Sequence, residues 1–269
     1  MQTESSSNHR NLEQLDFLSL VQGINREDAL LSARVASEAS HIAALCELVF
    51  DRLNAGGRLF YMGAGTSGRL GIVDASECPP TYGVPFDKVI GIIAGGDGAI
   101  RKAVEFAEDD EEQGFRDLEA YGVNEKDVVI GIAASGRTPY VIGALRTCRS
   151  KGIATGGVVC NKESKMRAVC DVCVEVETGP EFVTGSTRMK AGTATKMVLN
   201  MITTSVMIRL GHVKDNKMID MQLTNHKLIA RGTTMVMEAT GLAEEEAKSR
   251  LLAAGSVRKA VDHWQSEQG

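Results

Sequence analysis

The sequence predicts an α/β fold, with a doubly wound five-stranded parallel sheet, a long N-terminal helix and a C-terminal helical tail. Five short runs rich in Val and Ile are separated by segments of helical length, which indicates strands that alternate with helices. Several of these runs are apolar without alternation, as in strands that are covered on both faces of a parallel sheet. The five runs are residues 58–62, 88–94, 127–133, 153–160 and 172–176.

The long N-terminal helix is predicted from the spacing of apolar side chains. Apolar residues recur at intervals of three and four over residues 26–54, which is typical of one face of an amphipathic helix. Asn25 stands where a capping residue is expected, and Glu27 and Asp28 fall in the first turn, where carboxylates complement exposed amide groups.

Three further helices are expected after the strands. Residues 187–210 are apolar nearly all round, which predicts a helix that is buried within the domain or between subunits. Residues 218–239 and 243–264 also have helical patterns, with Gly241 as a break between them. We therefore expect one domain over residues 1–210 and a helical tail over residues 211–269.

Composition excludes several classes of protein. The chain of 269 residues is 43% hydrophobic and 24% charged, which is typical of a globular protein with a sizeable core. Its formal net charge of -5 leaves no broad basic surface, so we expect no nucleic-acid partner. The chain has no apolar run of ~18 residues and a polar N-terminus, so we expect a cytoplasmic protein without a membrane partner.

No metal site is expected. Cys170 and Cys173 form a CxxC pattern, but they lie in a strand-like run where residues three apart point to opposite faces. No second CxxC or nearby His completes a site, so two thiols in or near the core are the favoured interpretation.

Ligands of doubly wound sheets bind at the carboxyl ends of the strands, so the loops after the first three strands are the first candidates. The first loop, residues 63–69, has the pattern GxGxxG and contains Thr66 and Ser67. A dinucleotide site would need a carboxylate roughly 20 residues further on, and Glu77 and Asp97 are poorly placed for it. The two hydroxyls fit a sugar or a phosphate better.

Two more loops combine hydroxyls with a helix start. The loop 134–139 contains Ser135 and Thr138, and the loop 184–190 contains Ser186 and Thr187. Hydroxyls beside free backbone amides can bind a phosphate ester without a metal, although each hydroxyl alone could merely cap its helix. Three such loops at one edge of a sheet favour a phosphosugar site.

Two glutamates are candidates for acid–base chemistry. Glu77 follows an apolar stretch and precedes a rigid Cys-Pro-Pro turn. Glu108 lies in an acidic run, and spacing alone indicates a solvated helix face there. None of the five histidines has metal-ligand spacing or an obvious nucleophile as a partner, and the sequence has no Walker loop or nucleophile elbow.

Three segments resemble the N-acetylmuramic acid 6-phosphate etherases, a family of the sugar-isomerase (SIS) domain group. They are GRLFYMGAGTSGRLGIVDASECPPTYGV, VVIGIAASGRTPYVIGAL and GPEFVTGSTRMKAGTATKMVLNM, and the resemblance runs from about residue 15 to residue 227. It implies a phosphosugar-binding parallel sheet, a homodimer and no cofactor. The implied reaction, in cell-wall amino-sugar recycling or catabolism, eliminates lactate and then adds water, giving N-acetylglucosamine 6-phosphate and D-lactate.

The resemblance also assigns roles to residues. By similarity Glu77 corresponds to the proton-donating glutamate of the family, and Glu108 corresponds to the second catalytic glutamate, the base. The same comparison places a set of binding residues around the sugar and its phosphate: Thr66, Ser67, Ser135, Gly136, Thr138, Ser186 and Lys190.

The sequence departs from the family at its two ends. Thr3-Glu4 is followed by an irregular stretch, and the C-terminal tail is shorter than in many relatives, so a complete helical cap is an open question. A contribution of His226 or Lys227 from a neighbouring subunit is also left open.

Three other functions remain as alternatives. They are a non-catalytic phosphosugar sensor of the glucokinase-regulator type, a phosphosugar isomerase and a sugar-sensing transcription regulator. The last would need a basic helix-turn-helix module, for which residues 1–50 offer only three Lys or Arg. A sensor has no use for two glutamates in opposite protonation states. An isomerase also removes a proton next to a carbonyl, so only the family resemblance distinguishes it from an etherase.

Overall fold

The computed structural model describes residues 1–268, which divide into two compact units. The first unit comprises Met1–Ser76 and Asp87–Thr203, and the second comprises Glu77–Phe86 and the chain from Thr204 onward. The helices α4 (Gly65–Tyr82) and α8 (Lys190–Arg209) each begin in the first unit and end in the second. Residues 211–268, predicted as a tail, lie in the second unit.

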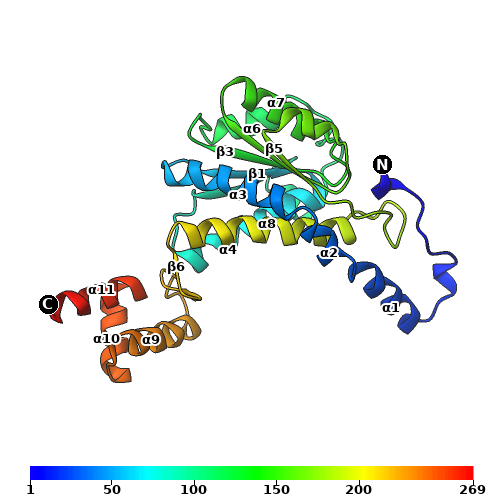
Figure 1. Ribbon diagram of the computed structural model, residues 1–269. Helices are drawn as coiled ribbons and strands as arrows, with labels where there is room; N and C mark the ends of the chain where they lie inside the picture. Colours follow the sequence, from blue (N-terminus) through cyan, green and yellow to red (C-terminus); the bar gives the residue numbers. More distant parts are fainter. Residues whose placement is uncertain (269) are drawn as a thin grey trace. The chain divides into compact units, whose positions relative to one another are not determined.

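A five-stranded parallel sheet forms the centre of the first unit, which confirms the predicted fold class (Figure 1). Its strands are β1 (Leu59–Gly63), β2 (Val89–Ile93), β3 (Val128–Ile132), β4 (Ala154–Val159) and β5 (Val172–Glu175). Their order is β2-β1-β3-β4-β5, and every neighbouring pair is parallel. β1, β3 and β4 are buried along their whole length, because helices cover both faces of the sheet.

The helices packed around the sheet provide this cover. α6 (Gln113–Ala120) packs on α7 (Pro139–Ser150), and α7 packs in turn on β3 and β4. α3 (Ala39–Asn54) contacts β5, β1 and β3, and Figure 1 shows it on the face of the sheet away from α6 and α7. The unit also contains α5 (Gly98–Arg101) and three short 3-10 helices, at Gln2–Glu4, Leu12–Gln14 and Lys165–Val169.

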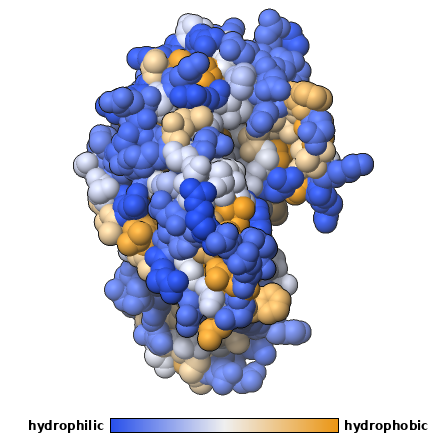
Figure 2. Space-filling model, turned by 90° about the vertical axis from the view of Figure 1, so that its right-hand side faces the viewer, coloured by the Kyte–Doolittle hydropathy of each residue, from blue (hydrophilic) through white to orange (hydrophobic). Residues whose placement is uncertain are grey.

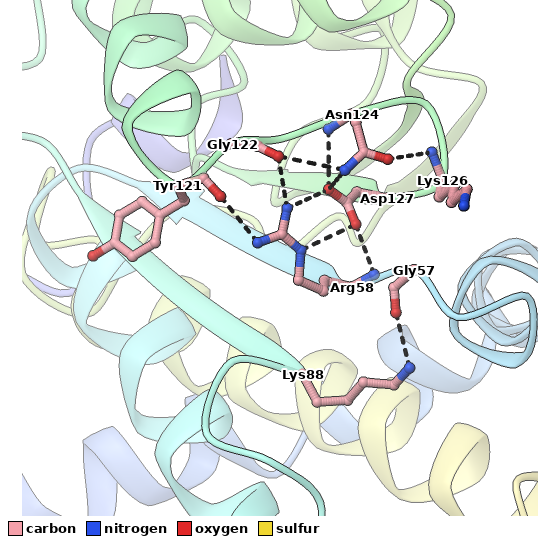
Figure 3. A network of polar contacts seen from close by, with 8 residues as sticks. All are labelled: Gly57, Arg58, Lys88, Tyr121, Gly122, Asn124, Lys126 and Asp127. Atoms are coloured by element: carbon pink, nitrogen blue, oxygen red, sulfur yellow. Dashed lines mark hydrogen bonds and ion pairs between the residues drawn. The ribbon is translucent and has the colours of Figure 1, made fainter.

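A polar network joins the amino ends of β1 and β3 (Figure 3). The Asp127 carboxylate, 1% exposed, accepts hydrogen bonds from the backbone N of Arg58 at 2.9 Å and from its Nη2 at 2.8 Å. Arg58 also donates to the carbonyls of Tyr121 and Gly122, and Asn124 donates its backbone N–H to Asp127. These bonds satisfy a buried charge at the edge of the sheet opposite to the carboxyl ends of the strands, so their role is structural.

The prediction of one long helix over residues 26–54 is wrong. Three helices cover the region: α1 (Phe17–Asp28), α2 (Leu31–Ala36) and α3. Asp16, not Asn25, caps the first of them by accepting a hydrogen bond from the backbone N of Ser19 at 2.8 Å. The breaks left no trace in the apolar pattern, because Leu31 and Val35 of α2 are buried like the corresponding residues of α3.

The helices of the second unit also differ from the prediction at their ends. Residues 213–218 form a two-stranded antiparallel ribbon, β6 (Val213–Lys214) and β7 (Lys217–Met218), so the helix predicted from residue 218 starts too early. The observed helices are α9 (His226–Thr240), α10 (Glu244–Ala254) and α11 (Val257–Gln268). Gly241 ends α9 as predicted, and Gly255, with a φ of 78°, divides the predicted helix 243–264.

Two remaining observations concern membranes and metals. No helix within residues 1–268 is both long and apolar enough to cross a membrane. The same residues contain no group of three or more His, Cys, Asp or Glu side chains that could hold a metal ion. Cys170 precedes β5 rather than lying in it, so the prediction that it shares a strand with Cys173 is wrong.

Candidate active site

A cavity of about 390 Å³ opens at the carboxyl ends of β1 and β3. The chain leaves β1 toward β2 on one side and later returns to β3 on the other, so the cavity lies at the switch point where ligands of such sheets bind. It is lined by Glu4, by residues 64–67 and Leu70, by Glu108 and Asp109, by residues of the loop 133–139, and by Thr187, Ala191, Gly192 and Thr195. Its volume suits a small organic ligand.

The loop after β1 brings Thr66 and Ser67 to the cavity as predicted. Both residues lie in the first turn of α4 and line the cavity. The glycines of this loop allow α4 to start close to the strand. A Cβ on Gly63 would lie 2.8 Å from the backbone N of Gly68, and a Cβ on Gly68 would lie 2.7 Å from the carbonyl oxygen of Gly63. The GxGxxG pattern is therefore explained by packing between strand and helix, without a dinucleotide.

The loop after β3 brings Ser135 and Thr138 to the same cavity. Thr138 stands at the N-cap position of α7, but its side chain makes no capping hydrogen bond. The alternative that Thr138 merely caps the helix is therefore wrong, and its hydroxyl can serve a ligand. Ser135 Oγ accepts a hydrogen bond from the backbone N of Arg137 at 3.2 Å, and Arg137 also lines the cavity.

Gly136 shapes this loop and is not a lining residue. Its φ is 65°, and a Cβ added there would lie 2.5 Å from Cβ of Ser164. Only glycine satisfies both conditions without moving its neighbour. Gly136 was predicted to lie around the ligand, and its contribution is to let the backbone turn tightly next to Ser135.

Glu108 lies in a turn between α5 and α6 and lines the cavity with an exposed side chain. The interpretation from spacing alone, a solvated helix face, is right about the exposure and wrong about the helix. The carbonyl oxygen of Glu108 accepts a hydrogen bond from the backbone N of Tyr140 at 3.0 Å, which fixes the residue against the first turn of α7. Glu108 also lines an adjoining cavity of about 190 Å³, which Gly65, Arg69 and Phe106 share.

Glu77 is not among the lining residues of either cavity. It lies on α4 with an exposed side chain, in the second unit of the chain. Its pairing with Glu108 stays a prediction.

Lys190 and Ser186, predicted to bind the ligand, do not line the cavity either. The Lys190 side chain is 4% exposed, and its Nζ lies 2.5 Å from Oε2 of Glu27. The other carboxylate oxygen of Glu27 lies 2.9 Å from Nε2 of His9. Burial alone would raise the pKa of Glu27, but hydrogen bonds from Lys190 and His9 outweigh it and hold this pKa below its ordinary value.

The start of α8 is already occupied by a carboxylate of the protein. Glu181 is 1% exposed and accepts hydrogen bonds from the backbone N of Lys190 at 2.8 Å and of Ala191 at 2.9 Å. Burial raises the pKa of Glu181, although the two backbone N–H groups oppose the shift. Since this carboxylate satisfies the exposed amides of α8, the starts of α4 and α7 are left to bind an anion.

Several lining residues were missed in the sequence. Thr187 belongs to the predicted loop 184–190, and Ala191 and Thr195 follow it at intervals of four, so the helical period of residues 187–210 could have placed these two on one face beside that loop. Arg137 stands between two predicted residues and is the one basic side chain among the described residues that line the cavity. No sequence pattern pointed to Glu4, because it lies near the N-terminus, far in sequence from the other lining residues.

The sheet order, the cavity at the switch point and the hydroxyl-bearing helix starts define a SIS-type phosphosugar-binding domain. Family models agree, since the glucokinase regulatory protein N-terminal SIS domain matches residues 41–149 and the SIS domain matches residues 99–205. The solved structure of a phosphoheptose isomerase from Francisella tularensis has the same fold. Its TM-score is 0.55 at 14% identity, covering 71% of this chain and 98% of that one.

Curated relatives identify the family. The chain is 54% identical to an N-acetylmuramic acid 6-phosphate etherase from Christiangramia forsetii, over 99% of this chain and 97% of the relative. It is 55% identical to an etherase of the same name from Porphyromonas gingivalis, over 97% and 95%. The chain belongs to the N-acetylmuramic acid 6-phosphate etherase family.

Proposed function

We propose that this protein is a lyase that cleaves the D-lactyl ether of N-acetylmuramic acid 6-phosphate, giving N-acetylglucosamine 6-phosphate and D-lactate. The observation that carries the proposal is identity above 50% to etherases over nearly the whole chain. This identity does not favour the alternative of a non-catalytic sensor, although the sensor shares the SIS fold. We place the reaction in cell-wall amino-sugar recycling or catabolism.

The substrate carries two anionic groups on a neutral sugar, and the cavity offers complementary groups. Thr66 and Ser67 at the start of α4, with Ser135 and Thr138 at the start of α7, offer hydroxyls beside helix N-termini, which suit the phosphate. The Arg137 guanidinium adds a positive charge to the same loop. A phosphate held there needs no metal ion.

The chemistry requires a base and an acid. In the ring-opened sugar, the aldehyde acidifies the neighbouring carbon that bears the amide, and a carboxylate removes that proton. The bond between the next carbon and the lactyl oxygen then breaks, an acid protonates the departing oxygen, and water adds to the resulting double bond. Glu108 in the cavity is the proposed base, and Glu77 is the proposed acid by similarity to the family.

We further propose that the protein is a cytoplasmic homodimer. The surface in Figure 2 is mostly hydrophilic with separate hydrophobic patches. Phe17, Leu18 and Val21 of α1 are 88%, 67% and 63% exposed, and such an apolar group is more often covered by a partner than left in water. Sedimentation of the purified protein tests the dimer.

The activity is tested by incubating the purified protein with N-acetylmuramic acid 6-phosphate and measuring released D-lactate. We expect lactate from the wild type, and at least a hundredfold slower release from Glu108→Gln and Glu77→Ala, since general acid–base catalysis contributes about 10²–10⁴-fold. Glu119→Gln is the matched control, because Glu119 is an exposed glutamate of α6 outside the cavity.

Other results would support the alternatives. Binding of the phosphosugar without release of lactate would indicate a sensor, and an isomeric sugar phosphate without lactate would indicate an isomerase. Full activity of Glu77→Ala would remove Glu77 from the mechanism while leaving the etherase proposal intact.

A further inference from the structure

The N-terminal residues form part of the wall of the cavity, and one buried side chain attaches them there. Asn161, which follows β4 and is 4% exposed, accepts hydrogen bonds at Oδ1 from the backbone N of Gln2 at 2.9 Å and of Thr3 at 3.2 Å. Its Nδ2 donates to Oγ1 of Thr3 at 2.8 Å and to the carbonyl of Ala134 at 2.9 Å. Ala134 lines the cavity, so Asn161 joins the N-terminal segment directly to the loop after β3.

A second attachment lies four residues after Thr3. Ser7 is buried, its Oγ donates to the carbonyl of Phe182 at 2.7 Å, and its backbone N donates to Oγ1 of Thr184 at 2.9 Å. Thr3 itself is fully buried. The segment between the two attachments is therefore held at both ends, and Glu4 is the residue of this segment that lines the cavity.

The Glu4 carboxylate has no protein partner. Within residues 1–268 its side chain makes no hydrogen bond or ion pair, although Oε2 would lie 3.6 Å from a Cβ added to Gly185, at the head of α8. Two anchored ends therefore position a carboxylate that the fold itself does not use.

We propose that Glu4 binds the substrate by accepting a hydrogen bond from an uncharged donor of the amino sugar, a ring hydroxyl or the acetamido N–H, and that Asn161 is the positioning residue for Glu4. An ionised carboxylate only accepts hydrogen bonds and repels phosphate, so it suits the neutral part of the ligand. The phosphate belongs at the starts of α4 and α7, which leaves the sugar to face Glu4. This inference rests on the proposed function, since it takes a phosphorylated amino sugar as the ligand.

The first test compares Glu4→Ala with the matched control Glu13→Ala, an exposed glutamate of the N-terminal region outside the cavity. Binding of N-acetylglucosamine 6-phosphate is measured by calorimetry, and KM and kcat are measured with N-acetylmuramic acid 6-phosphate. For Glu4→Ala we expect the Kd and KM to rise roughly ten- to hundredfold, as for loss of a hydrogen bond to a charged group, with an unchanged Tm. Glu13→Ala should match the wild type.

The second test is a double-mutant cycle between the two residues. Asn161→Ala should weaken binding by a similar factor in the wild type and by less than about twofold in the Glu4→Ala background, because Asn161 acts through Glu4. A merely structural Asn161 would weaken binding equally in both backgrounds. If Asn161→Ala does not fold, Thr3→Val, which removes the Oγ1 that accepts from Asn161 Nδ2, replaces it in the cycle; it should weaken binding less than Asn161→Ala would in the wild type and again by less than about twofold in the Glu4→Ala background.

The outcomes separate this proposal from the proposed function. Binding by Glu4→Ala as tight as by the wild type, or additive losses in the cycle, would overturn the role of Glu4 or of Asn161. A wild type that binds the amino sugar phosphate through Glu4 but releases no lactate would overturn the etherase and leave the Glu4 site standing. A wild type with neither binding nor lactate release would overturn both.

Discussion

Replacing Glu27 by glutamine tests whether Lys190 is a structural cation, as its contacts indicate, or a ligand-binding one, as predicted from the sequence. The Lys190 ammonium is nearly buried, and the Glu27 carboxylate is 16% exposed and 2.5 Å away. Removing one partner of a buried ion pair costs about 3–5 kcal/mol, because the remaining charge stays buried without compensation. We therefore expect Glu27→Gln to lower the free energy of unfolding by that amount.

The assay is thermal and urea unfolding of the variant. For a folding unit of about 200 residues, each kcal/mol shifts the Tm by about 2–4 °C, so Glu27→Gln should lower the Tm by about 6–20 °C. Glu47→Gln is the matched control, because Glu47 is an exposed glutamate of α3, and its Tm should change little. Lys190→Met in the Glu27→Gln background should recover part of the loss, since the unpaired charge is then gone.

The pH dependence gives an independent check. The pKa of Glu27 is held below its ordinary value of 4.5, so its contribution to stability is present above about pH 4.5 and is lost as pH falls through the folded-state pKa. The stability difference between wild type and Glu27→Gln should shrink over that acidic range.

Two results would refute this reasoning. A Tm change below 2 °C for Glu27→Gln would show that the pair contributes little, at about the level of an exposed ion pair. A Lys190→Met variant of normal Tm with a raised KM would instead restore Lys190 to the ligand site.

Three further predictions concern the cavity and the opposite edge of the sheet. Thr138→Val should raise the KM about tenfold with little change in Tm, because this hydroxyl makes no capping bond. A matching Tm loss would contradict its role in binding. The loop of Arg137 indicates that its guanidinium binds the phosphate, so Arg137→Gln should weaken binding of N-acetylmuramic acid 6-phosphate and of N-acetylglucosamine 6-phosphate equally. Weaker binding of N-acetylmuramic acid 6-phosphate alone would instead assign Arg137 to the lactyl carboxylate. Asp127→Asn should lower the free energy of unfolding by about 3 kcal/mol, since it leaves Arg58 without its charged partner. A change in KM without that loss of stability would contradict the structural role of Asp127.

Local sequence patterns predicted those residues of the candidate site that lie close in sequence to the start of a helix. Thr66, Ser67, Ser135 and Thr138 line the cavity because each follows the carboxyl end of a strand, and parallel strands bring those ends to one edge. Spacing misjudged Glu108, since an acidic run has the same composition in a helix and in a turn. What fixes Glu108 is a backbone hydrogen bond to Tyr140, more than 30 residues away.

The amino-acid sequence by itself determined the five strands, a helix within residues 187–210 and the family, because continuous apolar runs and glycine-hydroxyl loops are local signals. The prediction that this helix is buried holds for one face only, since Met201 and Ile208 of α8 are 41% and 46% exposed. Only the tertiary structure decided that Lys190 pairs with Glu27, that Glu181 caps α8 and that Asn161 binds Thr3, next to Glu4. Two of these contacts join residues more than 150 positions apart in the chain. No local pattern encodes such a contact, because it arises only when folding brings distant buried polar groups together to satisfy one another.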